Sequence, residues 1–325
     1  MIISKTPLRM SFAGGATDFK DYYQRKYGAV VSSAIDKYIY VSLNRKFDDS
    51  VRVSYSKTEE VSDINKLEHN LAREALRLTG VDKGVDINYA SDMLPAREGT
   101  GLGASSSLLV GILNVLHAYK GETPSSEQLA GEACRIEIET LKHPIGKQDQ
   151  YAAAFGNFNY IKFNPDESVL VEPLSADEEI PQELRKNLLL FYTGLSSSSE
   201  AVLPEQKEKI EKNVAVLDEM AKLADELNVS LRKKDTSSFG EILHQNWLLK
   251  KSLASKISNS KIDEYYEAAR GAGAAGGKIL GSGGGGFLLV FAKPENHENI
   301  RRALSGLKET KFNFEKEGSK IVYAD

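Results

Sequence analysis

The first half of the chain combines short apolar runs with segments of helical periodicity. Runs rich in β-branched and aromatic residues predict strands at residues 35–43, 51–55, 85–89, 157–163 and 169–171. Apolar residues at helical spacing predict helices at residues 65–78, 105–120, 126–141 and 147–154. Ser125 or Ser126 caps the third helix, and His143-Pro144 ends it. The last two strands are expected to pair as a hairpin.

The second half is predicted to form a separate domain. An acidic, proline-containing segment at residues 178–183 indicates the junction, which divides the chain into residues 1–180 and 181–325. Beyond it the pattern predicts strands at 188–192 and 287–291, helices at 239–253, 262–270 and 299–307, a long charged helical region at 201–233 and two short terminal strands. Strands and helices mixed in this way favour an α+β fold over a strictly alternating parallel sheet.

Composition and charge narrow the class of protein. The 325 residues are 41% hydrophobic and 27% charged, values typical of a soluble globular protein. A net charge of −4 without a basic stripe argues against a nucleic-acid partner. Because no segment approaches the roughly 20 apolar residues of a membrane helix, and the N-terminus lacks a signal-peptide run, we expect a cytoplasmic protein without a membrane partner. The single cysteine, Cys134, fits a reducing compartment, and the scattered histidines predict no zinc site.

The segment at residues 95–109, PAREGTGLGASSSLL, carries the strongest chemical signal. Three glycines come directly before three serines that open a helix, and the predicted phosphate-binding set is Gly99, Gly101, Leu102, Gly103, Ala104, Ser105, Ser106 and Ser107. Glycines let the backbone approach a ligand, while free N–H groups and the helix dipole favour phosphate. The serine hydroxyls suit a phosphate oxygen or a magnesium ion. The alternative is a flexible glycine loop with a serine N-cap.

Two carboxylates lie on either side of a Pro-Gly turn. Glu137 is on a predicted helix, and Asp149 follows twelve residues later at the start of a short helix. A kinase needs one carboxylate to bind magnesium and often a second to orient or deprotonate the attacking hydroxyl. The alternative is that Glu137 and Glu139 are solvated helix charges and that Asp149 is a first-turn carboxylate favoured by the helix dipole.

The N-terminal segment at residues 5–19, KTPLRMSFAGGATDF, places a charge inside a strand-like run. Because a buried charge is costly unless it is paired, we expect Arg9 to face a polar cleft. Gly14-Gly15 and then Thr17-Asp18 follow at a helix start. The alternative is an edge-strand arginine, with Asp18 as an ordinary N-cap.

Glycines are also concentrated at residues 271–287, GAGAAGGKILGSGGGGF. Gly283–Gly286 permit a tight turn beside another backbone or a phosphate, or a glycine hairpin without a ligand contact. The GxGxxG pattern of Gly271, Gly273 and Gly276 follows a helix and precedes a strand, the reverse of a dinucleotide site. The GGK run lacks the Ser or Thr of a Walker A loop, because Ile279 follows it.

These four segments, in this order, resemble the GHMP kinase superfamily, which includes galactokinase, homoserine kinase and mevalonate kinase. PLRMSFAGGATD is similar to its first motif, GTGLGASSS to its phosphate loop and GAAGGKILGSGGGGF to its third motif. PLRMSFAGGATDF, GKQDQYAAAFG and HQNWLLKKSL most resemble D-glycero-D-manno-heptose 7-phosphate kinases, which phosphorylate the anomeric hydroxyl. The resemblance implies a two-domain α+β fold, with a first domain like the second domain of ribosomal protein S5, a ferredoxin-like second domain, and ATP and sugar between them.

The resemblance also implies roles for individual residues. The glycine-serine segment would bind the phosphates of ATP, and Ser105 and Glu137 would hold Mg²⁺. Asp149 would orient or deprotonate the attacking hydroxyl, while Arg9 would stabilise the developing alkoxide. The residues implied to bind the sugar or shape its pocket are Asp18, Gly14, Gly15 and Gly284.

Two positions depart from the family pattern. Ala104 stands where the loop usually has its first serine, and residues 195–200, LSSSSE, lack the arginine that relatives often carry. Lys147 and Arg97 are candidates for the basic residue that replaces this arginine, because they lie beside matched motifs.

Other functions remain compatible with these motifs. A fucokinase-like or galactokinase-like hexose 1-kinase is the nearest enzyme alternative, and a decarboxylase on the same fold is a remote one. A non-catalytic sugar and nucleotide sensor is disfavoured, because Glu137 and Asp149 are both retained. A homodimer is compatible with the sequence.

Overall fold

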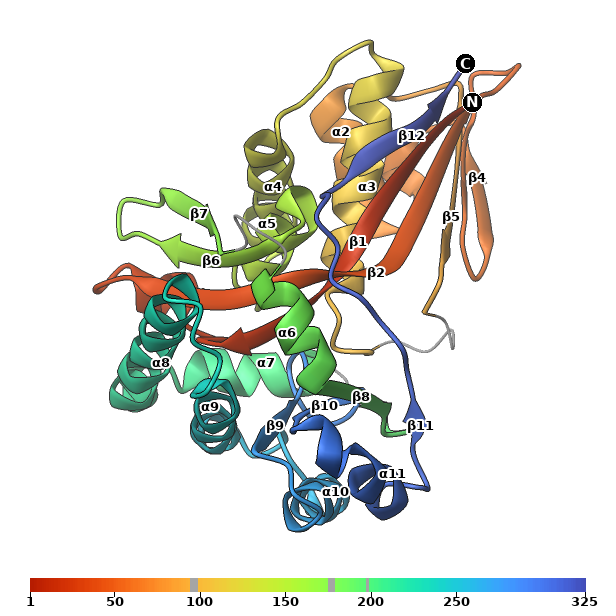
Figure 1. Cartoon of the computed structure of the whole chain (residues 1–325). Helices are drawn as coiled ribbons and strands as arrows, with labels where there is room; N and C mark the ends of the chain where they lie inside the picture. The colour runs from red at the N-terminus through yellow and green to blue at the C-terminus, as the bar shows by residue number, and fades with distance from the viewer. Residues whose placement is uncertain (94–98, 175–178, 197–198) are drawn as a thin grey trace.

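The computed structural model describes residues 1–93, 99–174, 179–196 and 199–325 (Figure 1). Within these residues eight strands form a larger sheet, ordered β12-β1-β2-β5-β3-β4, with β6 on β2 and β7 on β6. The strands are β1 (Ile2–Ala13), β2 (Gly28–Arg45), β3 (Val51–Ser54), β4 (Thr58–Val61), β5 (Val85–Ser91), β6 (Phe158–Phe163), β7 (Val169–Pro173) and β12 (Lys320–Ala324). β1 pairs antiparallel with both β12 and β2, so it lies in the interior of the sheet.

A layer of helices covers one face of this sheet (Figure 1). It contains α2 (Asn70–Thr79), α3 (Ala104–Tyr119), α4 (Ser126–Cys134), a π-helical turn (Arg135–Thr140) and α5 (Gln148–Phe155). α3 packs against β1 and β2 on one side and against α2, α4 and α5 on the other. This enclosure explains why residues 106–117 are all buried and why the helix is apolar on nearly every side. A short helix, α1 (Lys20–Tyr23), follows the turn after β1.

The rest of the chain builds a smaller sheet with its own helices. Four strands of the described chain are ordered β11-β8-β10-β9. They are β8 (Leu188–Tyr192), β9 (Gly276–Ile279), β10 (Phe287–Phe291) and β11 (Lys308–Glu309). The helices are α6 (Glu179–Asn187), α7 (Ser199–Glu208), α8 (Val214–Arg232), α9 (Phe239–Leu253), α10 (Ser260–Gly271) and α11 (His297–Ala303).

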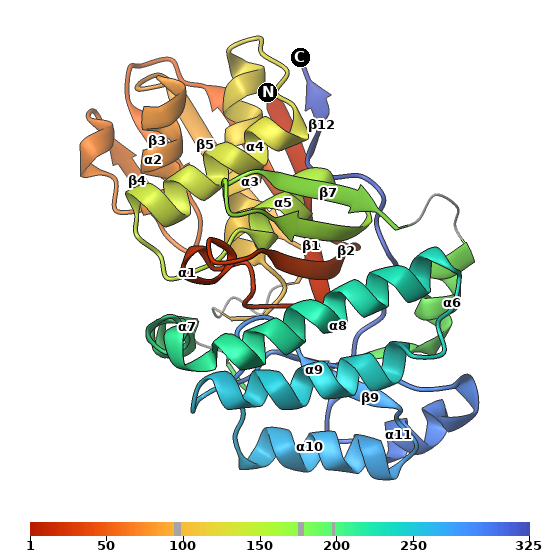
Figure 2. The ribbon, with the colours of Figure 1, turned by 90° about the vertical axis from the view of Figure 1, so that its left-hand side faces the viewer.

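Helices α8 and α9 lie between the two sheets (Figure 2). α8 packs on β1 and β2, while α9 contacts β9 of the smaller sheet and β1 of the larger one. The ring of Phe239 at the start of α9 lies 5.3 Å from that of Phe12 in β1. Apolar contacts of this kind hold α9 against β1. This packing positions the side chains that α9 contributes to the site described below.

Most of the predicted elements are confirmed, as is the α+β class. Strands β8 and β10 and helix α9 have the predicted bounds. The prediction of one helical region over residues 201–233 is wrong, because the chain breaks into α7, a 3₁₀ turn (Glu211–Asn213) and α8. At the break Asn213 donates a hydrogen bond of 3.1 Å to the carbonyl of Leu253 at the end of α9. A tertiary contact therefore accompanies the change of direction.

The division at residue 180 stays a prediction. The segment expected to be the junction continues into α6, and the end of the chain returns to the larger sheet, where β12 pairs with β1. The sequence predicts that the GxGxxG pattern follows a helix and precedes a strand. The structure confirms this order, because Gly271 ends α10 and Gly276 begins β9.

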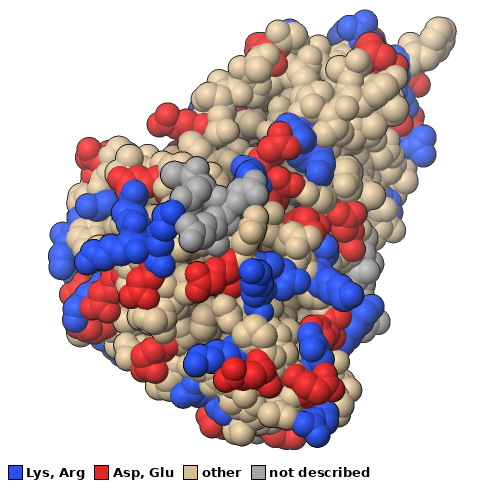
Figure 3. All heavy atoms as spheres, in the orientation of Figure 1, with Lys and Arg blue, Asp and Glu red and all other residues tan. Residues whose placement is uncertain are grey.

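The surface in Figure 3 carries acidic and basic side chains interspersed over both parts of the molecule. That face has no stripe of a single sign of the kind that binds nucleic acid. Among the helices of the described chain, none combines the length and the apolar character that a membrane span requires.

Candidate active site

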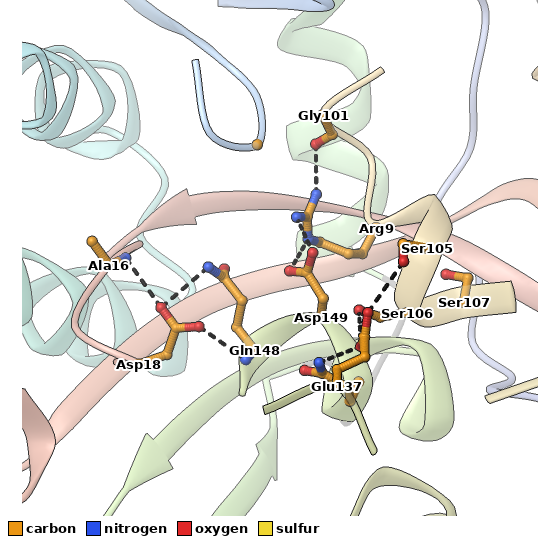
Figure 4. Close-up of polar contacts among 12 residues, drawn as sticks. Arg9, Ala16, Asp18, Gly101, Ser105, Ser106, Ser107, Glu137, Gln148 and Asp149 are labelled. Atoms are coloured by element: carbon orange, nitrogen blue, oxygen red, sulfur yellow. Dashed lines mark hydrogen bonds and ion pairs between the residues drawn. The ribbon is translucent and has the colours of Figure 1, made fainter. Parts of the chain in front are cut away.

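Arg9 and Asp149 form an ion pair at the centre of the site (Figure 4). β1 supplies Arg9, and the first turn of α5 supplies Asp149. The Arg9 Nε donates to Asp149 Oδ1 at 2.8 Å and Nη2 donates to Oδ2 at 2.7 Å. The Arg9 side chain is 4% exposed and that of Asp149 is 24% exposed. The alternative that Arg9 is an ordinary edge-strand arginine is therefore wrong. The bidentate ion pair with Asp149 compensates the burial of its charge.

Arg9 also holds the glycine loop against β1. Its Nη1 donates to the carbonyl of Gly101 at 2.6 Å, and its backbone N–H donates to the carbonyl of Leu102 at 3.0 Å. Gly99, Gly101 and Gly103 have φ values of 94°, 75° and 75°, a region that favours glycine. The loop conformation thus depends on these glycines. Residues 94–98, including the candidate Arg97, lie outside the described residues.

Helix α3 begins directly after this loop. Its N-cap is Gly103, so the alternative of a serine N-cap is wrong. The hydroxyl of Ser105 donates to Glu137 Oε1 at 3.1 Å, and that of Ser106 donates to Glu137 Oε2 at 2.7 Å. The hydroxyl of Ser107 instead donates to the carbonyl of Pro7 at 2.8 Å. Two of the three serines therefore meet the carboxylate, and the third fastens α3 to the sheet.

Glu137 lies on the π-helical turn and is 1% exposed, so it is not a solvated helix charge. Besides the two serines, Gln150 Nε2 donates to Oε2 at 2.5 Å. Burial raises the pKa of Glu137 to about 7, although the hydrogen bonds from Ser106 and Gln150 act in the opposite direction. A cation at this position would favour the ionised carboxylate.

Asp18 lies in the turn between β1 and α1 and is 2% exposed. It accepts hydrogen bonds from the backbone N–H of Ala16 at 3.1 Å and of Gln148 at 3.0 Å, and from Gln148 Nε2 at 3.3 Å (Figure 4). Phe19 is the N-cap of α1, so Asp18 does not cap that helix. Burial raises the pKa of Asp18 to about 6, despite the Gln148 N–H, and the nearby charge of Asp149 adds to the rise. Asp18 thereby joins the turn to the helix that carries Asp149.

The three glycines assigned to the sugar site differ in their surroundings. A Cβ at Gly14 would lie 1.8 Å from the carbonyl oxygen of Ala29, so backbone packing requires this glycine. At Gly15 the nearest atoms would be Ser11 Oγ at 3.8 Å and Gln148 Nε2 at 4.0 Å, so this position has room for a side chain. A Cβ at Gly284 would lie 3.1 Å from the carbonyl oxygen of Lys256 and 3.8 Å from the side chain of Val202, so its nearest neighbours are neither Asp18 nor Asp149.

Sequence reasoning missed the side chains that α9 brings to this site. Asn246 Oδ1 accepts the backbone N–H of Gly14 at 3.0 Å, and Lys250 donates to the carbonyl of Gly281. Both are buried on one face of α9, four residues apart. Polar residues at helical spacing within an otherwise apolar face were the available signal. Lys147, a candidate base, is paired instead with Glu167 at 2.6 Å.

Two buried polar atoms next to the Gly14–Asp18 turn have no hydrogen-bond partner among the described residues. They are Gln148 Oε1, an acceptor, and Asn246 Nδ2, a donor. Since buried polar groups are normally satisfied, this acceptor and donor suit a ligand with hydroxyl groups.

A metal ion here would need ligands from outside the protein. Along the described chain no three His, Cys, Asp or Glu side chains gather in a way that could hold a metal. Ser105 and Glu137 supply one hydroxyl and one carboxylate. Such a sparse set fits Mg²⁺, which usually retains water and binds one or two carboxylates together with substrate phosphates.

Comparison with known proteins agrees with this geometry. The model of the GHMP kinase N-terminal domain matches residues 65–157, and the model for the C-terminal region of GHMP kinases matches residues 227–308. The chain is 31% identical to D-glycero-alpha-D-manno-heptose 7-phosphate kinase of Campylobacter jejuni, over 98% of both chains. It is 24% identical to the bifunctional L-fucokinase/L-fucose-1-P guanylyltransferase of Bacteroides fragilis, over 94% of this chain and 36% of that protein.

A solved structure is similar over the full length. The crystal structure of a D-glycero-D-manno-heptose 1-phosphate kinase from Bacteroides thetaiotaomicron superposes with a TM-score of 0.82 at 26% identity, covering 100% of both chains. Together with the matched domains and the relative in C. jejuni, this similarity confirms the two-domain kinase fold. The chain therefore belongs to the GHMP kinase family and is a phosphotransferase.

Proposed function

We propose that this chain is an ATP- and Mg²⁺-dependent kinase that phosphorylates the anomeric hydroxyl of a D-glycero-D-manno-heptose 7-phosphate. The product would be the 1,7-bisphosphate, a precursor of the kind used to make nucleotide-activated heptose for surface glycans. The observation that carries the proposal is the Arg9–Asp149 pair held against the carbonyl of Gly101 (Figure 4). It combines an acceptor for a hydroxyl proton, a fixed cation and a glycine loop at a helix start.

The phosphates of ATP are proposed to bind at the start of α3. Gly103 caps the helix without a side chain, which leaves the first N–H groups of Ala104, Ser105 and Ser106 available to an anion. The positive end of the helix dipole adds to the attraction.

Mg²⁺ is proposed to bind to Ser105 and Glu137, whose oxygens are 3.1 Å apart. The ion would neutralise part of the phosphate charge during transfer. The protein supports this role by burying Glu137 and by holding it with Ser106 and Gln150.

The remaining chemistry is positioning and charge stabilisation, which phosphoryl transfer chiefly requires. Asp149 would accept a hydrogen bond, and then the proton, from the attacking hydroxyl. Arg9 keeps Asp149 oriented and would stabilise the negative charge that develops on the sugar oxygen. Asp18, with the unsatisfied atoms of Gln148 and Asn246, would bind further hydroxyls of the sugar.

A substrate panel tests the proposal. Initial rates are measured with Mg²⁺-ATP and with heptose 7-phosphate, unphosphorylated heptose, L-fucose and galactose. We expect the highest kcat/KM with heptose 7-phosphate and phosphorylation at C1. A higher kcat/KM with an unphosphorylated hexose would replace the proposal with a hexose 1-kinase, and ATP binding without turnover would favour a sensor.

A further inference from the structure

Lys250 is a buried cation with few partners. It lies on α9, is 4% exposed, and among the described residues the carbonyl of Gly281 is the acceptor that its ammonium contacts. An ammonium group has three donors, and burying its charge is costly unless an anion compensates it. No described carboxylate forms an ion pair with Lys250, whereas the adjacent Lys251 pairs with Asp263 at 3.1 Å. The two neighbouring lysines therefore differ in the compensation that they receive.

The contacts of Lys250 place it beside the catalytic pair. Gly281, its acceptor, packs so closely on the phosphate loop that a Cβ there would lie 2.3 Å from the Cα of Gly101. Gly101 in turn accepts a hydrogen bond from Arg9. A single layer of glycine backbone thus connects the Lys250 ammonium to the Arg9 guanidinium.

The surrounding charges agree with this position. Burial, together with the charge of Arg9, lowers the pKa of Lys250 to about 8, although the charges of Asp18 and Asp149 act in the opposite direction. Asp149 is already paired with Arg9 by two hydrogen bonds, and Asp18 accepts its hydrogen bonds from Ala16 and Gln148. The positive charge of Lys250 is left for a group that is not part of the described chain.

A second lysine is buried near Lys250. Lys278 on β9 is fully buried, and its ammonium lies 3.5 Å from the carbonyl of Phe12. Burial, with the charges of Lys250 and Arg9, places its pKa well below the usual value. The lowered pKa favours the neutral amine of Lys278, so the positive charge on this side of the site is that of Lys250. An anionic ligand nearby would favour the charged form of both lysines.

We propose that Lys250 is a phosphate-binding residue of the active site, whose ammonium contacts a phosphoryl oxygen once both substrates are bound. The proposal rests on the proposed function, since it requires phosphate groups between Gly101 and Asp18. The group is either the phosphoryl in transfer or the phosphate that the sugar already carries. Both have the same chemistry, and the experiment below distinguishes them.

The test compares Lys250→Met with the matched control Lys251→Met. Methionine keeps an unbranched apolar side chain as far as Cε and removes the charged ammonium group. We expect Lys250→Met to lower kcat/KM at least 100-fold, in line with the loss of one charge-stabilising donor, and to leave Tm unchanged or higher. Lys251→Met should stay within twofold of wild-type kcat/KM. Lys250→Arg, which keeps the charge, should recover part of the lost activity.

The kinetic constants identify the phosphate. A fall in kcat with both KM values unchanged assigns Lys250 to the transferred phosphoryl. A rise in the KM for the sugar phosphate, with lost preference over the unphosphorylated sugar, assigns it to the phosphate already present. Either result supports the proposal. It is overturned if Lys250→Met keeps kcat/KM within threefold, or if activity and Tm fall together and Lys250→Arg restores neither.

The test of Lys250 does not depend on which sugar is the true acceptor. If the wild type prefers another acceptor, the same variants are compared with that acceptor. If no acceptor turns over, thermal stabilisation by a non-hydrolysable ATP analogue with inorganic phosphate replaces the rates. A smaller stabilisation of Lys250→Met than of Lys251→Met supports the proposal, and equal stabilisation contradicts it.

Discussion

The site lies between two walls whose charges are compensated in different ways. The larger-sheet wall consists of β1, the start of α3, the π-helical turn and the start of α5, and the smaller-sheet wall consists of α9 and β9. On the larger-sheet wall, Asp149 is paired with Arg9, and Glu137 accepts hydrogen bonds from two serines and Gln150. On the smaller-sheet wall, Lys250 and Lys278 contact one carbonyl each within the described chain. The first wall is organised by its own hydrogen bonds, whereas on the second Lys250 carries a positive charge that an anion would compensate. The groups proposed to act in catalysis thus lie mainly on the first wall, and the second wall supplies a cation for a bound anion.

Among the proposed substitutions, removing the Asp149 carboxylate should have the largest effect on the rate of the reaction. Asp149→Asn keeps the size of the side chain but removes the proton acceptor and weakens the pairing with Arg9. We expect kcat to fall about 10³-fold, with affinity for an ATP analogue unchanged within threefold. Steady-state kinetics and calorimetric titration measure the two quantities. A variant with near wild-type kcat would remove Asp149 from the mechanism.

The two walls meet where Gly101 packs against Leu280 and Gly281, and a substitution of Gly101 should disrupt this contact. In Gly101→Ala a Cβ would lie 2.4 Å from the carbonyl oxygen of Leu280, at a φ of 75°. The clash and the left-handed backbone together should lower the free energy of unfolding by about 3 to 4 kcal/mol.

Gly121→Ala is the matched control for this substitution. Its φ is 78°, but no atom lies within 4 Å of the added Cβ. We expect a loss of about 1 kcal/mol from backbone strain alone. Equal losses in the two variants, measured by urea unfolding, would mean that the packing of the two walls contributes little.

The buried carboxylate of Asp18 gives a stability difference that depends on pH. Its pKa is about 6 in the folded protein, above the ordinary 3.8, so the folded state favours the protonated form. Stability is therefore lost as pH rises from about 4 to 6, by up to about 3 kcal/mol at 1.36 kcal/mol per pKa unit. Asp18→Asn lacks this loss, so its stability relative to the wild type should rise between pH 4 and pH 7. A relative stability that is independent of pH in urea unfolding would contradict the cause given for the shift.

The Glu137 position should respond to the metal concentration. Glutamine keeps one carbonyl oxygen, which can bind the metal or accept a hydrogen bond from one of the two serines, so Glu137→Gln should lower kcat/KM about 30-fold. Raising the Mg²⁺ concentration should recover part of this loss, whereas it should not help Asp149→Asn. A defect in Glu137→Gln that ignores Mg²⁺ would argue against metal binding at Ser105 and Glu137.

The sequence predicted the larger-sheet wall better than the smaller-sheet wall for a physical reason. The glycine-serine segment and Asp149 lie in short continuous motifs, where turn chemistry and helix starts are local properties. The role of Lys250 depends on α9 docking against the turn after β1 and against Gly281, which no local pattern reports. Glu137 was predicted as a candidate ligand, but its π-helical turn and its burial depend on packing around α3 and α5.

Backbone contacts between distant segments explain other differences. Gly14 was assigned to the sugar, yet the close approach of Ala29 already requires a glycine there. Ser107 was grouped with the phosphate-binding serines, yet its hydroxyl bonds to Pro7. The helical region over 201–233 gave no sign of the contact between Asn213 and Leu253 that accompanies its break.

The central claim is that the phosphates of the nucleotide bind at the start of α3, opposite Asp149. A crystal structure of the protein with Mg²⁺ and a non-hydrolysable ATP analogue tests it most directly. We expect the phosphates on the backbone N–H groups of residues 103–106, with the metal between Ser105 and Glu137. Phosphates bound at any other helix or turn, or the absence of nucleotide at saturating concentration, would contradict the account.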